Sequence, residues 1–275
     1  MRTLLSTITA LVAFAANSLL NRAALATTEM APATFTGIRL ISGAVVLGLL
    51  VHLRKRRFEV AGSWISAASL LLYAVAFSYA YVSLDAGAGA LILFGGVQIT
   101  MFGGALLSGE KPGGMRWLGS SLGLAGLAVL FLPGAGTPSA GGILLMLAAA
   151  FGWGVYSLRG RGAAEPLITT AGNFVRLAPA GGLLLVIGAG ESSLSAIALA
   201  SASGALASGL GYSVWYAALR GLDASLAAIA QLSVPLIALA GGMLLLGEEP
   251  TPAFLAASLL ILGGVALAVL APRRS

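Results

Sequence analysis

Cysteine is absent from this sequence, histidine occurs once, and charged residues are scarce. Of the 275 residues only 9% are Asp, Glu, Lys or Arg, whereas 59% are hydrophobic and the mean hydropathy is +0.99. A soluble domain carries about a quarter charged residues, so this chain lacks the polar side chains needed to coat a water-facing surface. Without cysteine there are no disulfides and no thiolate metal sites. The composition therefore favours a protein that lies in a lipid bilayer.

Catalytic residue patterns are missing as well. The lone His52 lies at the end of an apolar run, which leaves no Ser-His pair at membrane depth. Paired carboxylates within an apolar run and a phosphate-binding GxxxxGK loop do not occur. We expect no catalytic residue, no metal and no cofactor, with a membrane-embedded enzyme and a receptor or scaffold as the rival classes.

The excess of basic residues does not indicate a nucleic-acid partner. The formal net charge is +6 and the pI is about 10.2, but the Lys and Arg residues lie between apolar runs rather than along one face. We expect the lipid bilayer as the surroundings of this chain and no nucleic acid as its partner.

Ten apolar runs follow one another along the chain. About 20 helical residues cross a hydrocarbon core of about 30 Å, and helices satisfy their own backbone hydrogen bonds inside lipid. Alternating strands of about ten residues, which a membrane barrel requires, do not occur. The sequence therefore predicts an all-α integral membrane protein with ten transmembrane helices. The predicted spans are 3–25, 32–53, 63–84, 87–107, 114–132, 140–158, 166–189, 196–219, 223–246 and 252–271.

Basic residues gather on one side of the predicted membrane. With a cytoplasmic N-terminus and alternating crossings, twelve Lys and Arg residues fall inside and only Arg22 falls outside. This positive-inside distribution predicts that both termini are cytoplasmic. The inside residues are Arg2, Arg54, Lys55, Arg56, Arg57, Lys111, Arg116, Arg159, Arg161, Arg220, Arg273 and Arg274.

The two halves of the chain match each other. The pair Arg39-Leu40 recurs 137 positions later as Arg176-Leu177, and three other matches recur at an offset of 138. We divide the chain into repeats 1–134 and 135–275, each with five predicted helices. Because five is odd, the second repeat enters the membrane from the opposite side, which is a plan typical of secondary transporters. The other matches are Leu84-Asp85-Ala86 with Leu222-Asp223-Ala224, Gly109-Glu110 with Gly247-Glu248, and Pro112 with Pro250.

The repeat has two further consequences. The first helix has a partner in the second half, so it belongs to the fold and is not a cleaved signal peptide. The matching sequences GEKP at 109–112 and GEEP at 247–250 follow apolar runs. Gly can cap one helix, Glu favours the positive N-terminus of the next helix, and Pro suits its first turn. The alternative is that these segments form a gate.

These motifs, in this order and spacing, resemble the EamA-type drug/metabolite transporter superfamily over essentially the whole chain. Within that superfamily the chain resembles bacterial exporters of aromatic and other amino acids. The resemblance implies a bacterial inner membrane protein and a central cavity between the first to fourth and sixth to ninth helices. It places the fifth and tenth helices at the periphery. The alternative substrates are nucleotide-sugars or sugar phosphates, which would require several cationic residues in the cavity.

Polar side chains at mid-membrane are candidates for that cavity, because burying them without partners is costly. Gln98 and Gln231 are the only glutamines and both fall near midspan. They contact substrate or water, or else they hydrogen-bond neighbouring helices together. Phe14, Asn17 and Asn21 recur at helical spacing in the first span and form one mixed face.

Aromatic side chains supply a second set of candidates. An aromatic-lined neutral pocket suits a flat apolar substrate through stacking and burial. Residues near helix ends have an interfacial aromatic belt as the alternative. The deeper candidates are Tyr73, Trp153 and Tyr212, and the further candidates for substrate contact are Tyr79, Tyr156 and Trp215.

Arg39 and Arg176 are the intramembrane charges, in the predicted second and seventh helices. A buried arginine needs partners. Both residues either bind backbone carbonyls and hold their repeat together, or one of them neutralises a substrate carboxylate. Asp85 and Asp223 lie at helix ends, and no acidic residue is securely placed at midspan. We therefore expect facilitated export of small molecules, amino acids above all, rather than tight proton or sodium coupling.

Several residues can weaken helices and are hinge candidates. Proline frees a backbone carbonyl and glycine loosens a helix, although glycines also permit close packing. Gly119 and Gly123 form a small-residue face that favours packing over a dimer seam, so we expect a monomer or a weak dimer. The hinge candidates are Gly95, Gly96, Gly209, Gly211 and Pro235.

Overall fold

The computed structural model describes residues 1–26, 28–56, 59, 61–84, 86–131, 139–246 and 251–271. Throughout this part of the chain the regular structure is helical. Several residues used above lie outside the described residues, as does the side chain of Arg22. They are Arg57, Asp85, Gly247, Glu248, Pro250, Arg273 and Arg274.

The helices follow the predicted apolar runs closely. Many begin at a proline, which lacks the N–H group that would stay unpaired there, or at a serine or threonine whose side chain accepts a hydrogen bond from a backbone N–H group. The elements are α1 (Arg2–Ala26), α2 (Pro32–Lys55), α3 (Trp64–Ala80), α4 (Ala86–Leu107), α5 (Gly114–Phe131), α6 (Ala140–Gly160), α7 (Pro166–Ile187), α8 (Leu194–Ala202), η2 (Ser203–Leu210), α9 (Gly211–Leu219), α10 (Ala224–Gln231), α11 (Val234–Leu246) and α12 (Pro252–Leu270).

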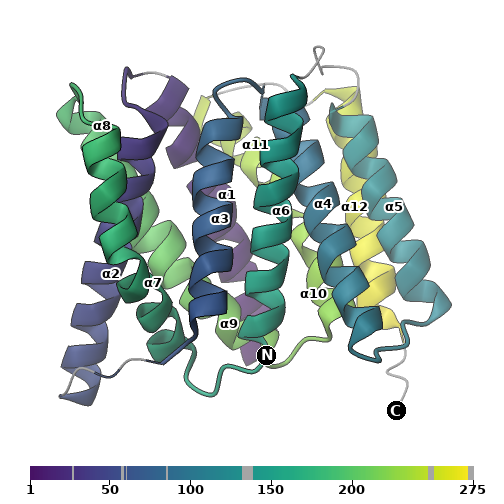
Figure 1. The fold of residues 1–275 in the computed structure, drawn as a ribbon. Coiled ribbons are helices and arrows are strands. Elements are labelled where there is room, and N and C mark those ends of the chain that lie inside the picture. The colour runs from purple at the N-terminus through teal and green to yellow at the C-terminus, as the bar shows by residue number, and fades with distance from the viewer. Residues whose placement is uncertain are drawn as a thin grey trace.

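Eight helical segments of the described chain are long and apolar enough to cross a membrane. The helix α3 is apolar but has only 17 residues, so the count of ten crossings stays a prediction. The helices run side by side, and α1 begins at the same end of the bundle where α12 ends (Figure 1). Leucines cover the outside: Leu107 is 92% exposed, Leu194 is 83% exposed and Leu259 is 78% exposed. Such a surface suits lipid, and the chain is an all-helical multi-pass membrane protein.

The helices pack in pairs that join the two halves of the chain. The most extensive contacts are α2 with α7 and α5 with α12, followed by α3 with α6. The α5–α12 pair lies at one edge of the bundle (Figure 1). Gly119 allows α5 and α12 to approach each other closely, because a Cβ at this position would collide with the backbone oxygen of Gly264. The predicted packing role of Gly119 is thereby confirmed.

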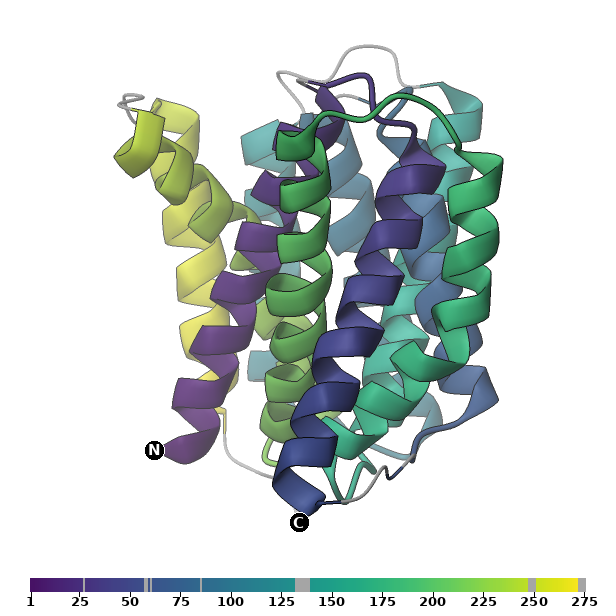
Figure 2. The same cartoon turned by 90° about the vertical axis from the view of Figure 1, so that its left-hand side faces the viewer.

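Two of the predicted helices are irregular. The span predicted at 196–219 consists of α8, the π-helical segment η2 and α9, which form one rod between α1 and α2 (Figure 2). The span predicted at 223–246 breaks between Gln231 and Val234, just before Pro235. Proline has no N–H to continue the ladder, which accounts for that position. By contrast, α4 continues unbroken through Gly95 and Gly96.

Candidate functional site

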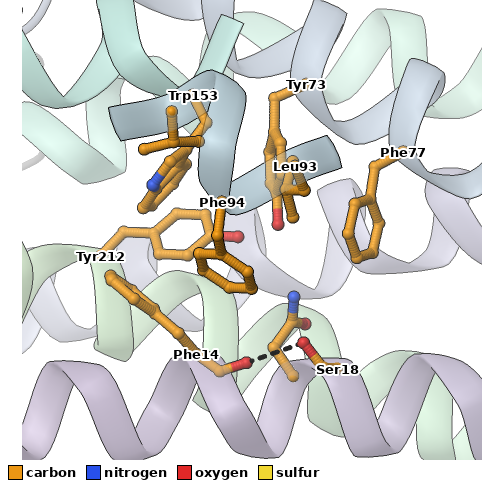
Figure 3. Close-up of a pocket in the computed structure, with 10 residues that line it drawn as sticks. Phe14, Ser18, Tyr73, Phe77, Leu93, Phe94, Trp153 and Tyr212 are labelled. Carbon is orange, nitrogen blue, oxygen red and sulfur yellow. Dashed lines mark hydrogen bonds between the residues drawn. The ribbon is translucent and has the colours of Figure 1, made fainter. Parts of the chain in front are cut away.

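A small closed cavity lies in the centre of the bundle, where α1, α3, α4, α6 and α9 meet (Figure 3). Its volume is about 20 Å³, which is room for about one water molecule. Binding sites for small molecules are usually several hundred Å³, so this cavity has no room for such a molecule in the present structure. The lining residues are Phe14, Asn17, Ser18, Tyr73, Phe77, Leu93, Phe94, Val97, Trp153 and Tyr212.

Aromatic rings from both halves of the chain pack against one another around this cavity. The ring centroid of Trp153 lies 5.1 Å from that of Phe14, 5.0 Å from that of Tyr73 and 4.6 Å from that of Tyr212. These spacings are those of favourable edge-on and tilted aromatic pairs. Trp215 extends the cluster away from the cavity, 5.5 Å from Phe14. The ring cluster thus joins helices from both halves of the chain.

The two glutamines support the cavity without lining it. Gln231 accepts a 2.6 Å hydrogen bond from Nε1 of Trp153 and donates to the sulfur of Met101. Gln98 donates a 2.7 Å hydrogen bond to Ser120 in α5. In this closed structure both residues make the interhelical bonds of the second interpretation, and Gln231 sets the position of the Trp153 ring.

Arg39 lies beside the cavity and is 1% exposed. Its Nε donates to Ser208 Oγ at 2.8 Å, and its Nη2 donates to the hydroxyl of Tyr212. Its Cζ lies 5.2 Å from the ring centroid of Tyr73, a cation–π contact. The remaining nitrogen, Nη1, is buried and has no hydrogen-bond partner. None of the described helices contains an Asp or Glu residue, so no acidic side chain of these helices balances the charge.

The segment η2 brings Ser208 to this arginine and Ser203 to Asn17. Oδ1 of Asn17 accepts a 2.6 Å hydrogen bond from Ser203 and a 3.5 Å hydrogen bond from Ser208. Gly204 lets η2 approach α2, because a Cβ there would collide with the backbone carbonyl of Arg39. Rare π-helical turns often occur at functional sites. Here the turn places the Ser208 hydroxyl group beside a buried cation.

Arg176 occupies the matching position in the second half but has different partners. It is half-buried, and its Nη1 donates to the backbone oxygens of Ala61 and Gly172 at 2.6 and 2.8 Å. Its Cζ lies 5.8 Å from the ring centroid of Trp64. These bonds tie α7 to the segment before α3. The predicted binding to backbone carbonyls is thus found, but Ala61 belongs to the first half, so Arg176 also joins the two halves rather than only holding its own repeat together.

Comparison with known proteins places the chain in a family. The sequence profile of the EamA-like transporter family matches residues 1–132 and again residues 140–270. The chain belongs to the EamA-like transporter family. It is therefore a membrane transporter of small molecules, and the members of its family are transporters rather than enzymes.

Individual relatives support this assignment. The uncharacterized protein PA1977 of Pseudomonas aeruginosa is 54% identical, over 99% of this chain and 96% of that protein. The uncharacterized transporter YoaV of Bacillus subtilis is 25% identical, over 86% of this chain and 87% of its own length. A crystal structure that is 22% identical superposes with a TM-score of 0.78, over 95% of this chain and 98% of the other. That last likeness supports the fold alone.

Not every residue proposed from the sequence lies at the cavity of this EamA-like transporter. The structure brings together Phe14, Asn17, Tyr73, Trp153 and Tyr212. Other candidates are elsewhere: Asn21 is buried in α1, Tyr79 is 37% exposed, Tyr156 packs on Tyr216, Trp215 donates to Ser157, and neither Gln98 nor Gln231 lines the cavity.

Five lining residues were missed, namely Ser18, Phe77, Leu93, Phe94 and Val97. Phenylalanine and aliphatic residues are so common in apolar spans that they carry little information. Helical spacing could have found some of them, since Ser18 lies four positions after Phe14 and Phe77 lies four positions after Tyr73.

A second polar cluster joins the two halves of the transporter at one end of the bundle. Arg116 is 7% exposed and binds Glu110 Oε1 at 2.9 Å, Ser225 Oγ at 3.0 Å and the carboxylate of Asp223. Oε2 of Glu110 also accepts from the backbone N–H groups of Ala224 and Ser225 at 3.0 and 3.4 Å. Glu110 therefore caps α10.

This arrangement corrects one expectation. Gly109 does cap α4: its φ is +85°, and the N–H groups of Gly109 and Glu110 bond the carbonyls of Leu106 and Ala105. The prediction that Glu110 acts on the next helix in sequence is wrong. Its carboxylate lies at the positive N-terminus of α10, because tertiary packing brings that helix start closer to it.

A larger hollow of about 360 Å³ lies between α2, α7, α8 and η2. Its lining is almost entirely aliphatic, with Ser42 and Ser201 as the polar members, and it includes Val45, which is 62% exposed. An aliphatic surface groove of this kind suits lipid chains. It offers none of the directional groups that surround the central cavity.

Proposed function

We propose that this transporter exports aromatic amino acids, together with other neutral amino acids, through the central cavity. The observation that supports this proposal is the ring of aromatic side chains around the cavity, contributed by α1 and α3 from the first half and by α6 and α9 from the second. Rings that pack on one another in the closed site can pack on a substrate ring in an expanded one.

Export requires alternating access, because the closed cavity is too small for an amino acid. We propose that repeats 1–134 and 135–275 are inverted and that the helices rearrange about weak points in their backbones. In the two repeats α6 is the counterpart of α1, and the rod from α8 to α9 is the counterpart of α3. The contact between α3 and α6 therefore has its counterpart in the contact between α9 and α1, and both contacts occur. If the two halves exchange conformations, each of these contacts takes on the arrangement of the other. The irregular turns at Gly209, Gly211 and Pro235 support movement of α8 to α11, while Gly95 and Gly96 are the corresponding candidates in α4.

The cluster around Arg116 is suited to be the gate at one end. It joins the segment between α4 and α5 to the start of α10. Opening of that end would therefore break the ion pair of Arg116 with Glu110 or with Asp223. The positive-inside distribution assigns this end to the cytoplasm. We place the protein in a bacterial inner membrane with both termini cytoplasmic.

Topology can be tested directly in this cysteine-free chain. An Arg56→Cys variant should react with an impermeant thiol reagent only after the membrane is permeabilised. Labelling from the periplasmic side of intact cells would contradict the orientation.

The absence of acidic residues from the described helices supports facilitated export down a gradient, since no carboxylate there can relay a proton. The rival substrates, nucleotide-sugars and sugar phosphates, would require several cations at the cavity. Among the described residues only Arg39 lies beside it, while Arg176 binds backbone carbonyls.

Counterflow in liposomes tests the proposed function. Purified protein is reconstituted with unlabelled phenylalanine inside, and the uptake of labelled phenylalanine, tryptophan, threonine, a simple amine and a hexose phosphate is compared. We expect exchange of the amino acids, fastest for the aromatic ones, without chemical change. Exchange of the hexose phosphate alone would refute the proposal.

A further inference from the structure

The deepest charge in this bundle lacks a counter-charge from the helices around it. Arg39 is 1% exposed, and a guanidinium group stays protonated in proteins. Its partners are two hydroxyl groups and one aromatic ring. Burying a cation without an anion is costly, and natural proteins normally pair such groups. The unpartnered Nη1 is therefore free to donate hydrogen bonds to a ligand.

The cavity lies next to this charge. Two of the residues that line it, Tyr73 and Tyr212, are also partners of the guanidinium group. Figure 3 shows the hydroxyl groups of these two tyrosines directed into the same part of the cavity. Arg39 thus lies behind the tyrosine hydroxyl groups of a cavity whose other lining residues are aromatic and aliphatic, apart from Asn17 and Ser18.

We propose that Arg39 binds the carboxylate of the substrate, and that the cavity prefers aromatic carboxylates without an ammonium group to amino acids. This inference rests on the proposed role of the cavity as the transport site and specifies its ligand chemistry. One carboxylate neutralises Arg39 and accepts hydrogen bonds from its free N–H groups, as arginine–carboxylate pairs do.

Charge balance in the closed site explains the preference. An amino acid carries a carboxylate that pairs with Arg39 and an ammonium group that needs an anion of its own. The described helices offer no Asp or Glu. Two nearby acceptors are already engaged: Asn17 Oδ1 by Ser203, and the carbonyl of Phe14 by Ser18. An amino acid therefore leaves one uncompensated charge, and a carboxylic acid anion leaves none.

Three ligands with the same phenylethyl skeleton separate these contributions. They are 3-phenylpropionate with a carboxylate alone, phenylalanine with both groups, and phenethylamine with an ammonium alone. Equilibrium binding to the purified full chain is measured by calorimetry at pH 7. We expect 3-phenylpropionate to bind about tenfold more tightly than phenylalanine, since unpaired buried charges commonly cost more than one pKa unit. Phenethylamine should bind most weakly, and binding as tight as that of 3-phenylpropionate would overturn the inference.

Two matched variants assign the preference to Arg39. Arg39→Gln removes the charge but keeps N–H donors, and it should reduce the ratio between 3-phenylpropionate and phenylalanine to about twofold or less. Arg176→Gln makes the same change at the matching position of the other half and should keep the wild-type order. If Arg39→Gln does not fold, Arg39→Lys keeps the charge and should keep the order. An unchanged ratio in Arg39→Gln, or a reversed order in Arg39→Lys, would overturn the inference.

Liposome exchange with the same ligands distinguishes a failure of this inference from a failure of the proposed function. If phenylalanine is exchanged but the affinities of the three ligands do not follow their charges, the inference alone is contradicted. Exchange of 3-phenylpropionate without exchange of any amino acid would contradict the proposed function alone.

Discussion

Arg39 and Arg116 are both buried, yet their surroundings are opposite. Arg116 lies at the end of the bundle between Glu110 and Asp223, with Ser225 as a further partner. Arg39 lies in the middle of the bundle with hydroxyl groups and a ring around it and one nitrogen left over. The first arginine is satisfied within the protein, whereas the second keeps binding capacity for something else.

The difference follows from where acidic side chains are found. All described Asp and Glu residues lie in the connections or at helix starts, where water or helix termini stabilise their charge. An arginine near a connection can therefore find carboxylates, and an arginine at mid-helix cannot. Burial alone thus says little about the role of a charged residue, and the partners decide it.

The largest expected effect is on stability, at Arg116. Replacing Arg116 with Met leaves Glu110 and Asp223 without their cation and should lower the free energy of unfolding by about 3 kcal/mol, as for other broken buried pairs. Arg39→Met removes a desolvated, unpaired charge and should change it by less than about 1 kcal/mol. Denaturation in mixed micelles measures both. Equal losses would show that the two arginines are equivalent structural anchors.

The next effect concerns the aromatic wall beside Arg39. Trp153→Ala should weaken transport of phenylalanine relative to threonine by roughly one to two decades, because about 1–3 kcal/mol of stacking and burial is lost. Trp153→Phe keeps a ring while it loses the hydrogen bond to Gln231, so it should retain most of the preference. Transport is compared at matched amounts of folded protein. An equal decrease for both amino acids, together with lower stability, would mean that Trp153 serves folding alone.

A smaller effect is expected at Arg176, the sequence counterpart of Arg39. Arg176→Met loses the hydrogen bonds to the Ala61 and Gly172 carbonyls and should lower the free energy of unfolding by about 1.5 kcal/mol. Transport per folded molecule should stay within about twofold of wild type in liposomes. A stable Arg176→Met protein with selectively lost recognition of carboxylates would make this residue, too, a substrate ligand.

The smallest effect is expected at the exposed ion pair Lys55–Glu165, whose charged atoms lie 2.7 Å apart. Its hydrogen bond to Lys55 lowers the pKa of Glu165. A lowered folded-state pKa means that this stabilisation is complete above about pH 4.3, the ordinary glutamate value, and is lost as the pH falls through the folded-state pKa. Lys55→Met should barely change thermal stability at pH 7, and the difference should vanish in acid. A loss of stability at pH 7 as large as that of Arg116→Met would contradict the expectation that an exposed ion pair contributes less than a buried one.

Helix positions were predictable, because a chain that spans lipid with helices needs about 20 consecutive apolar residues for each crossing. The predicted spans 32–53 and 252–271 differ from the observed α2 and α12 by two residues or fewer at each end. The π-helical turn at Ser203–Leu210 was not predicted. It depends on the fit of Gly204 against α2, a contact between residues far apart in the chain.

The candidate site was predictable in part. Aromatic residues at depth, such as Tyr73, Trp153 and Tyr212, do surround the cavity. For the glutamines the sequence was informative only in part: polarity at midspan marked Gln98 and Gln231 correctly as buried, but it did not indicate which neighbour each would bind. A hydrogen-bond partner is set by the rotation of one helix against another, and a single helix sequence does not contain that information.

Composition, hydropathy and the spacing of apolar runs determined by themselves that this chain is a helical membrane protein, since long helices satisfy their own backbone groups in lipid and the alternating strands of a barrel do not occur. The repeated Arg-Leu pair likewise marked Arg39 and Arg176 as counterparts. Only the tertiary structure decided that Arg176 binds backbone carbonyls while Arg39 meets hydroxyl groups beside a cavity. The physical reason is that hydrogen bonds and charge pairs act over a few ångströms. Two arginines in matching Arg-Leu pairs therefore have different hydrogen-bond partners, because different helices pack against them.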